Sequence, residues 1–156
     1  MKRFFFDCGT RDATASLGIF ALRVMIGLMM FFGHGISKIE NFAAVKGGFP
    51  VPDFFPLKYM TSQVSLIACI GAEVVAAAMI VLGIATRPAA FVLGFNMVVA
   101  AFAVHASAPW FVGPGISEAK ETALLYLIPL VAIILTGAGS YSLDAAIYKE
   151  GKRRRW

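Results

Sequence analysis

Titratable side chains lie within or at the ends of long apolar stretches of this sequence, where charge is costly and usually paired or functional. The candidate catalytic residues are Arg23, His34, Glu73, His105 and Glu121. The candidate cofactor-binding residues are His34, Lys38, His105 and Glu121. Histidine titrates near physiological pH and can exchange a proton with the carbonyl of a quinone-like ring. A buried Glu73 could relay a proton, and Arg23 could offer a fixed cation to a carbonyl or an anionic head group.

The stretches that carry these residues are apolar enough to cross a membrane. Hydrophobic residues make up 59% of the 156-residue chain and charged residues 15%, whereas soluble domains have about 45–50% and 25%. A spanning helix needs roughly 20 mainly apolar residues, and four windows qualify: 15–36, 60–84, 88–106 and 122–138. Because lipid-exposed backbone must satisfy its own hydrogen bonds, these windows should be helices. The sequence predicts an all-α membrane protein, a single domain over 1–156 built as a four-transmembrane-helix bundle.

Basic residues predict the orientation of that bundle. With four spans, both termini and the turn after residue 84 lie on one side of the membrane. Of the 14 lysines and arginines, nine fall on that side and four on the other, with Arg23 inside the first span. The positive-inside bias then predicts cytoplasmic N- and C-termini. The basic C-terminal tail suits anionic membrane lipids better than nucleic acid, so no nucleic-acid partner is expected.

A predicted inner layer consists of Arg23, Glu73 and Asn96. If the ends of the helices are level, Arg23 lies about 12 Å, Glu73 about 16 Å and Asn96 about 12 Å from the cytoplasmic ends of their spans. Two interpretations stay open. An Arg23–Glu73 ion pair could fix the register of two helices, although desolvation offsets much of its attraction. Alternatively, these groups could take part in proton transfer.

A predicted outer layer forms where antiparallel spans end together. His34 and Lys38 end the first span, His105 ends the third and Glu121 begins the fourth. Two histidines and a carboxylate could hold a transition metal, but no local HxxxH or ExxH pair is present, and we predict no metal site. Hydrogen bonding to a quinone-like ligand and interfacial hydrogen bonding with a snorkelling Lys38 both stay open.

Helix geometry favours part of this arrangement and opposes another part. Arg23 and His34 are eleven residues apart, so they differ by only about 20° around an ideal helix and share one face. Asn96 and His105 are nine residues apart, or about 180°. Both can face the bundle centre only if the third span bends or unwinds.

Small residues predict two kinds of close approach. Three glycines near the polar face of the first span would admit another backbone or a ligand: Gly27, Gly33 and Gly35. A small-residue face on the second span would pack against other subunits: Gly71, Ala72, Ala76, Ala77 and Ala78.

Four segments resemble the DoxX family of small bacterial membrane proteins. In the family's order they are "LRVMIGLMMFFGHGISKI" (22–39), "GAEVVAAAMIVLGIATRPAA" (71–90), "KETALLYLI" (120–128) and "GAGSYSLDAAI" (137–147). The resemblance implies a four-helix, multi-pass protein of the bacterial cytoplasmic (inner) membrane. A relative, the small subunit of a thiosulfate:quinone oxidoreductase, implies quinone-linked redox chemistry, and other members are associated with membrane oxidoreductase assemblies. The family-like polar positions are Arg23, His34, Lys38, Glu73 and Glu121.

Three functions follow for such a chain. The first is a subunit of a redox-associated membrane assembly that binds a quinone. Because the sequence has no haem CxxCH, no iron–sulfur cysteine set and no dinucleotide fingerprint, a separate cofactor-bearing partner would be needed and no covalent cofactor is expected. The alternative is a non-catalytic accessory subunit of a larger membrane complex, and a homo-oligomer is a further option. A proton-coupled carrier using Glu73 is the third, so whether the chain is an enzyme stays open.

Overall fold

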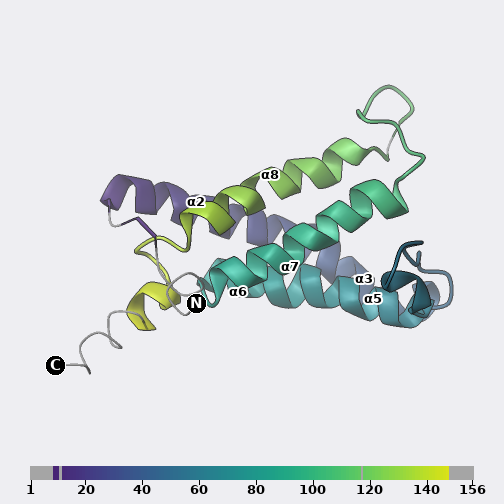
Figure 1. Cartoon of the computed structure of the whole chain (residues 1–156), viewed down its shortest axis with the longest axis horizontal. Helices are drawn as coiled ribbons and strands as arrows, with labels where there is room; N and C mark the ends of the chain where they lie inside the picture. The colour runs from purple at the N-terminus through teal and green to yellow at the C-terminus, as the bar shows by residue number, and fades with distance from the viewer. Residues whose placement is uncertain (1–8, 11, 117, 148–156) are drawn as a thin grey trace.

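The computed structural model describes residues 9–147 except 11 and 117. Within these residues the chain is helical and contains no β-strand. Figure 1 shows an elongated bundle whose helices run roughly along its long axis. Both terminal segments, on which the predicted cytoplasmic orientation depends, lie outside the described residues.

Three long helices combine α-helical and π-helical segments. The first consists of α2 (Ala13–Met30), η1 (Phe31–Gly35) and α3 (Ile36–Glu40). The second consists of α5 (Ser62–Ile70), η3 (Gly71–Ala76) and α6 (Ala77–Leu82). The third consists of α7 (Thr86–Val99) and η4 (Ala100–Val104). The remaining elements are α4 (Phe42–Val45), the short 3₁₀ turn η2 (Leu57–Tyr59) and α8 (Lys120–Thr136).

In the part of the chain that the structure describes, three helices, not the expected four, are long and apolar enough to cross a membrane. They are Ala13–Glu40, Ser62–Leu82 and Thr86–Val104, of 28, 21 and 19 residues. The window predicted at 122–138 forms α8, which has 17 residues. It is short because Ala119 before it is extended and Gly137 after it has a φ of +85°. Nevertheless α8 packs along α7 and buries Leu130 and Ile133 in the core (Figure 1).

Glycines let the first and second long helices meet backbone to backbone. A Cβ on Gly27 would lie 2.5 Å from Val81 Cγ2 and 3.0 Å from the Ala77 carbonyl oxygen. A Cβ on Gly35 would lie 2.6 Å from Val74 Cγ2 and 3.0 Å from the Glu73 carbonyl oxygen. Gly33 has no such neighbour within 4 Å. The predicted close approach is therefore confirmed at two of the three glycines.

The segment after α8 fastens the turn between α6 and α7. The Asp144 carboxylate accepts hydrogen bonds from the backbone N–H groups of Ala85 (2.8 Å) and Thr86 (2.9 Å) and from the Thr86 hydroxyl (2.8 Å). The Asp144 N–H donates to the Gly83 carbonyl at 2.8 Å. Asp144 thus satisfies the first N–H groups of α7, a capping role that Ala85 cannot fill with its own side chain.

Candidate functional site

The π-helical segments lie next to the predicted polar residues. His34 lies within η1, Glu73 lies within η3, and His105 directly follows η4. Segments of this kind are rare and often occur at functional sites because they re-aim side chains within an otherwise regular helix.

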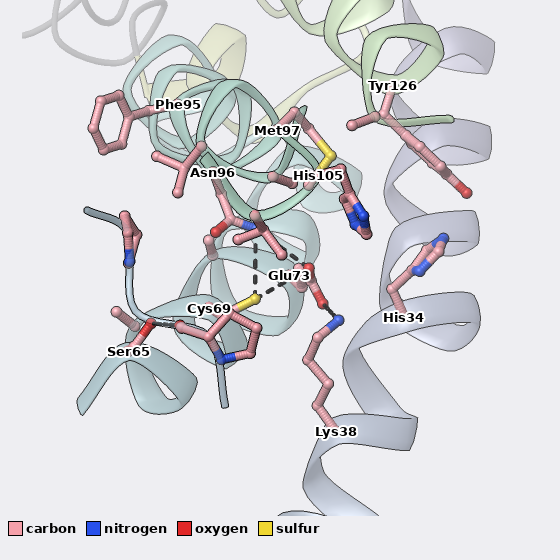
Figure 2. A pocket seen from close by; sticks show the side chains of 18 of the residues that line it. His34, Lys38, Ser65, Cys69, Glu73, Phe95, Asn96, Met97, His105 and Tyr126 are labelled. Atoms are coloured by element: carbon pink, nitrogen blue, oxygen red, sulfur yellow. Dashed lines mark hydrogen bonds and ion pairs between the residues drawn. The ribbon is translucent and has the colours of Figure 1, made fainter. Parts of the chain in front are cut away.

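A cavity of about 400 Å³ lies between the helices at this level. Its polar lining consists of His34, Lys38, Ser65, Cys69, Glu73, Asn96, His105, Thr122 and Tyr126. Apolar side chains form the rest of the wall, and the segment between α4 and α5 adds Phe49, Pro50, Pro52, Leu57 and Met60. Figure 2 shows the labelled polar side chains arriving from different helices around one space.

Glu73 is the most buried charged group of this cavity. It is 4% exposed, and its Oε2 accepts from Lys38 Nζ at 2.5 Å. Its Oε1 accepts from Asn96 Nδ2 and from Cys69 Sγ, both at 3.3 Å. Three donors therefore surround the carboxylate, as buried charges require (Figure 2).

The π segment η4 brings both Asn96 and His105 to the cavity. The His105 N–H donates to the Ala100 carbonyl five residues earlier, at 2.9 Å. Because this wider turn takes up one additional residue, the angle between Asn96 and His105 falls from about 180° to about 80°. The third span thus departs from a regular helix through a π segment, which lets Asn96 and His105 face the same side. Both side chains line the cavity (Figure 2).

The two histidines have different neighbours. The His34 ring packs edge to face against Tyr126, with ring centroids 5.4 Å apart. His105 Nδ1 lies 3.8 Å from a carboxylate oxygen of the exposed Glu118. Among the described residues, neither the ring nitrogens of His34 nor the hydroxyl of Tyr126 has a hydrogen-bond partner. Both half-buried groups can therefore bond to a ligand in the cavity.

The structure merges parts of the two predicted layers. Lys38, His34 and His105 of the outer layer line the same cavity as Glu73 and Asn96 of the inner layer. The reason is that the helix ends are not level. α2 extends past the turn between α6 and α7 (Figure 1), so the long first helix is shifted along the second.

The predicted Arg23–Glu73 pair is wrong. Arg23 is fully buried and donates to the carbonyls of Ile80 (2.6 Å), Val81 (3.2 Å) and Tyr141 (2.7 Å). Lys38, fifteen residues further along the first helix, occupies the position beside Glu73. Arg23 therefore joins the end of α6 to the segment after α8 and does not line the cavity.

Glu121 also lies outside the cavity lining. Its Oε2 accepts from the Val112 N–H at 2.9 Å, and its own N–H donates to the Trp110 carbonyl at 3.0 Å. In addition, Lys120 Nζ lies 5.0 Å from the Trp110 ring centre. These contacts hold the loop that precedes α8.

Cys69 and Tyr126 were missed by sequence reasoning. Cys69 precedes Glu73 by four residues, which places both side chains on one face of a helix. That spacing could have predicted Cys69 as a neighbour of Glu73. Tyr126 had no such signal, since its approach to His34 depends on how α8 packs against the first helix.

Comparisons with known proteins agree with the helical membrane architecture. The DoxX family model matches residues 18–106. An uncharacterised protein of Haemophilus influenzae (strain ATCC 51907 / DSM 11121 / KW20 / Rd) is 26% identical over 153 residues, which cover 96% of each chain. A second uncharacterised protein of that strain is 29% identical over 131 residues, 83% of this chain and 90% of the relative. No solved structure matches the chain. Since the family model covers more than half of the sequence, this small membrane protein belongs to the DoxX family.

Proposed function

We propose that this protein binds a quinone in the cavity and acts in a redox-associated membrane assembly with a separate cofactor-bearing partner. The observation that carries the proposal is the cavity of about 400 Å³ within the apolar helices, into which a few hydrogen-bonding groups converge. Sites for organic ligands have this composition, with mainly apolar walls and volumes of about 300–1,000 Å³.

The charges of the cavity favour a neutral ligand with hydrogen-bond acceptors. Lys38 and Glu73 form an ion pair, so their charges largely cancel. The Lys38 ammonium carries three N–H donors, and Glu73 is its only hydrogen-bonding partner among the described residues. The remaining donors can bind a ligand carbonyl, as can His34 and Tyr126. A quinone ring presents two carbonyl oxygens and two flat apolar faces to such a site.

Proton exchange is the chemistry that the chain itself can contribute. A bound quinone supplies two-electron, two-proton redox chemistry. The His34 imidazole can donate a proton to a ring carbonyl or accept one from the reduced ring. His105, joined to the exposed Glu118, links the cavity lining to the surface loop. The electrons would come from the partner, in keeping with the absence of an electron-carrier motif in the sequence.

The proposed setting is the bacterial cytoplasmic membrane. In it α8, with its 17 residues, would be a short fourth helix of the bundle, since it packs along the spanning helix α7. The accessory-subunit alternative receives less support. Ala72, Ala76 and Ala77 of the small-residue face are buried within the chain itself, so they are not available to another subunit.

Binding of a decyl-substituted benzoquinone to the detergent-purified full chain tests the ligand. Lys38→Met and His34→Ala should each weaken binding about tenfold, through loss of a hydrogen bond to a carbonyl. Lys46→Met, on the exposed loop after α4, is the matched control and should bind like the wild type. The proposal fails if the wild type does not bind, or if both cavity variants bind as well as the control. Mass spectrometry of proteins that co-purify from native membranes tests the partner.

A further inference from the structure

The cavity does not end at its polar cluster. Its lining continues between α5 and α7, where it includes Ala68, Val92 and Phe95. These three side chains also reach the outer surface of the bundle, and Val92 and Phe95 are 49% and 46% exposed. The polar chamber is therefore continuous with an apolar groove that opens sideways, between two membrane-spanning helices.

The groove exists because α5 and α7 separate. α7 packs against α6, η3 and α8, whereas α5, which η3 continues in the same helix, packs against α3. Figure 1 shows α7 rising away from α5 beyond the α6–α7 turn. Where the groove meets the chamber, Asn96 Nδ2 lies 3.7 Å from Cys69 Sγ (Figure 2). Because Ala68 has only a methyl side chain, it does not fill the groove from the α5 side.

The loop before α5 also lines the cavity and is fastened to α5. Phe49, Pro50 and Pro52 line the cavity, and Pro52 is buried. The Ser65 hydroxyl donates to the Pro50 carbonyl at 2.7 Å, which holds this segment against α5.

We propose that the ligand carries a long apolar tail, which lies in the groove between α5 and α7 while its ring occupies the polar chamber. This inference rests on the proposed quinone site and narrows it to lipid-tailed quinones that enter from the bilayer. The tail is placed in the groove because the groove is apolar, faces lipid and runs without a break into the chamber. Burial of each methylene there adds to affinity.

Ring-labelled decyl- and methyl-substituted benzoquinones test this inference in equilibrium binding to the detergent-purified full chain. Ala68→Trp should fill the groove and weaken binding of the decyl compound about tenfold, while binding of the methyl compound changes less than about twofold. Val92→Trp, on the opposite wall, should do the same. Ile67→Trp is the matched control, because Ile67 is the exposed neighbour of Ala68 and does not line the cavity. Each labelled quinone is compared across variants, so its partitioning into micelles cancels.

The outcomes separate this inference from the proposed function. If the methyl compound binds and both groove variants bind the decyl compound like the control, the ring site stands and the tail groove is wrong. If decyl alcohol displaces the decyl quinone as well as unlabelled quinone does, the groove is a general lipid site and the inference is overturned. If the wild type binds neither quinone, the proposed function fails and the inference fails with it.

Discussion

At one end of the bundle, Arg23 is buried against backbone carbonyls; further along, Glu73 is buried beside Lys38 at the wall of a cavity. Both sites place a charge among apolar helices, but Glu73 and Lys38 line the cavity, whereas Arg23 does not. The Nη1 and Nη2 groups of Arg23 donate to the main chain of α6 and to the Tyr141 carbonyl, whereas its buried Nε has no hydrogen-bond partner among the described residues. The Glu73 cluster keeps donors for a ligand. The difference teaches that burial of a charge does not by itself identify a functional group, since a position at the wall of a cavity is needed as well.

Arg23→Met should have the largest effect, and that effect should be on the stability of the fold. It leaves three carbonyl contacts without their donor, and we expect the free energy of unfolding to drop by about 4 kcal/mol. Thermal unfolding in detergent measures the loss. Arg23→Lys, which keeps one charge-assisted donor, should recover part of the stability. For both variants, quinone binding per folded molecule should match that of the wild type. A loss of binding by folded Arg23→Lys would remove the contrast between the two sites.

Lys38→Met should affect both stability and binding. It leaves the Glu73 carboxylate buried without its cation, which should cost about 3 kcal/mol of unfolding free energy. The double variant Lys38→Met/Glu73→Gln removes both charges and should regain most of that stability without regaining quinone binding. Recovery of binding in the double variant would show that Lys38 only neutralises Glu73 and does not contact the ligand.

Gly35→Ala should separate the first two helices next to Glu73. Its Cβ would lie 2.6 Å from Val74 Cγ2 and 3.0 Å from the Glu73 carbonyl oxygen, so we expect a loss of about 2 kcal/mol and weaker binding. Gly33→Ala is the matched control, because no atom lies within 4 Å of its Cβ. It should be neutral or more stable by up to about 1 kcal/mol. Equal unfolding temperatures for the two variants would contradict the close helix contact at Gly35.

Glu121→Ala should have the smallest effect. It removes the acceptor for the Val112 N–H in an exposed loop, so the loss of stability should stay near or below 1 kcal/mol. Quinone affinity should remain within about twofold of the wild type. A tenfold loss would return Glu121 to the ligand site, where the sequence had placed it.

Regular helix geometry was a sound guide over short distances and failed over long ones. It placed Lys38 and His34 together at one end of the first span, and both line the cavity. It paired Arg23 with Glu73 because it assumed level helix ends, whereas the first helix is shifted along the second. It also predicted Asn96 and His105 on opposite faces of the third span, since no feature of "AAFAV" predicts a π segment.

By itself, the sequence determined that the chain forms apolar helices with a few titratable side chains, because composition and span length depend only on local residues. It also determined family membership. The tertiary structure decided which charges meet, since the axial shift between helices depends on contacts such as those at Gly27 and Gly35. It further decided that the polar groups surround a cavity. Those features result from packing between distant segments, which no local pattern records.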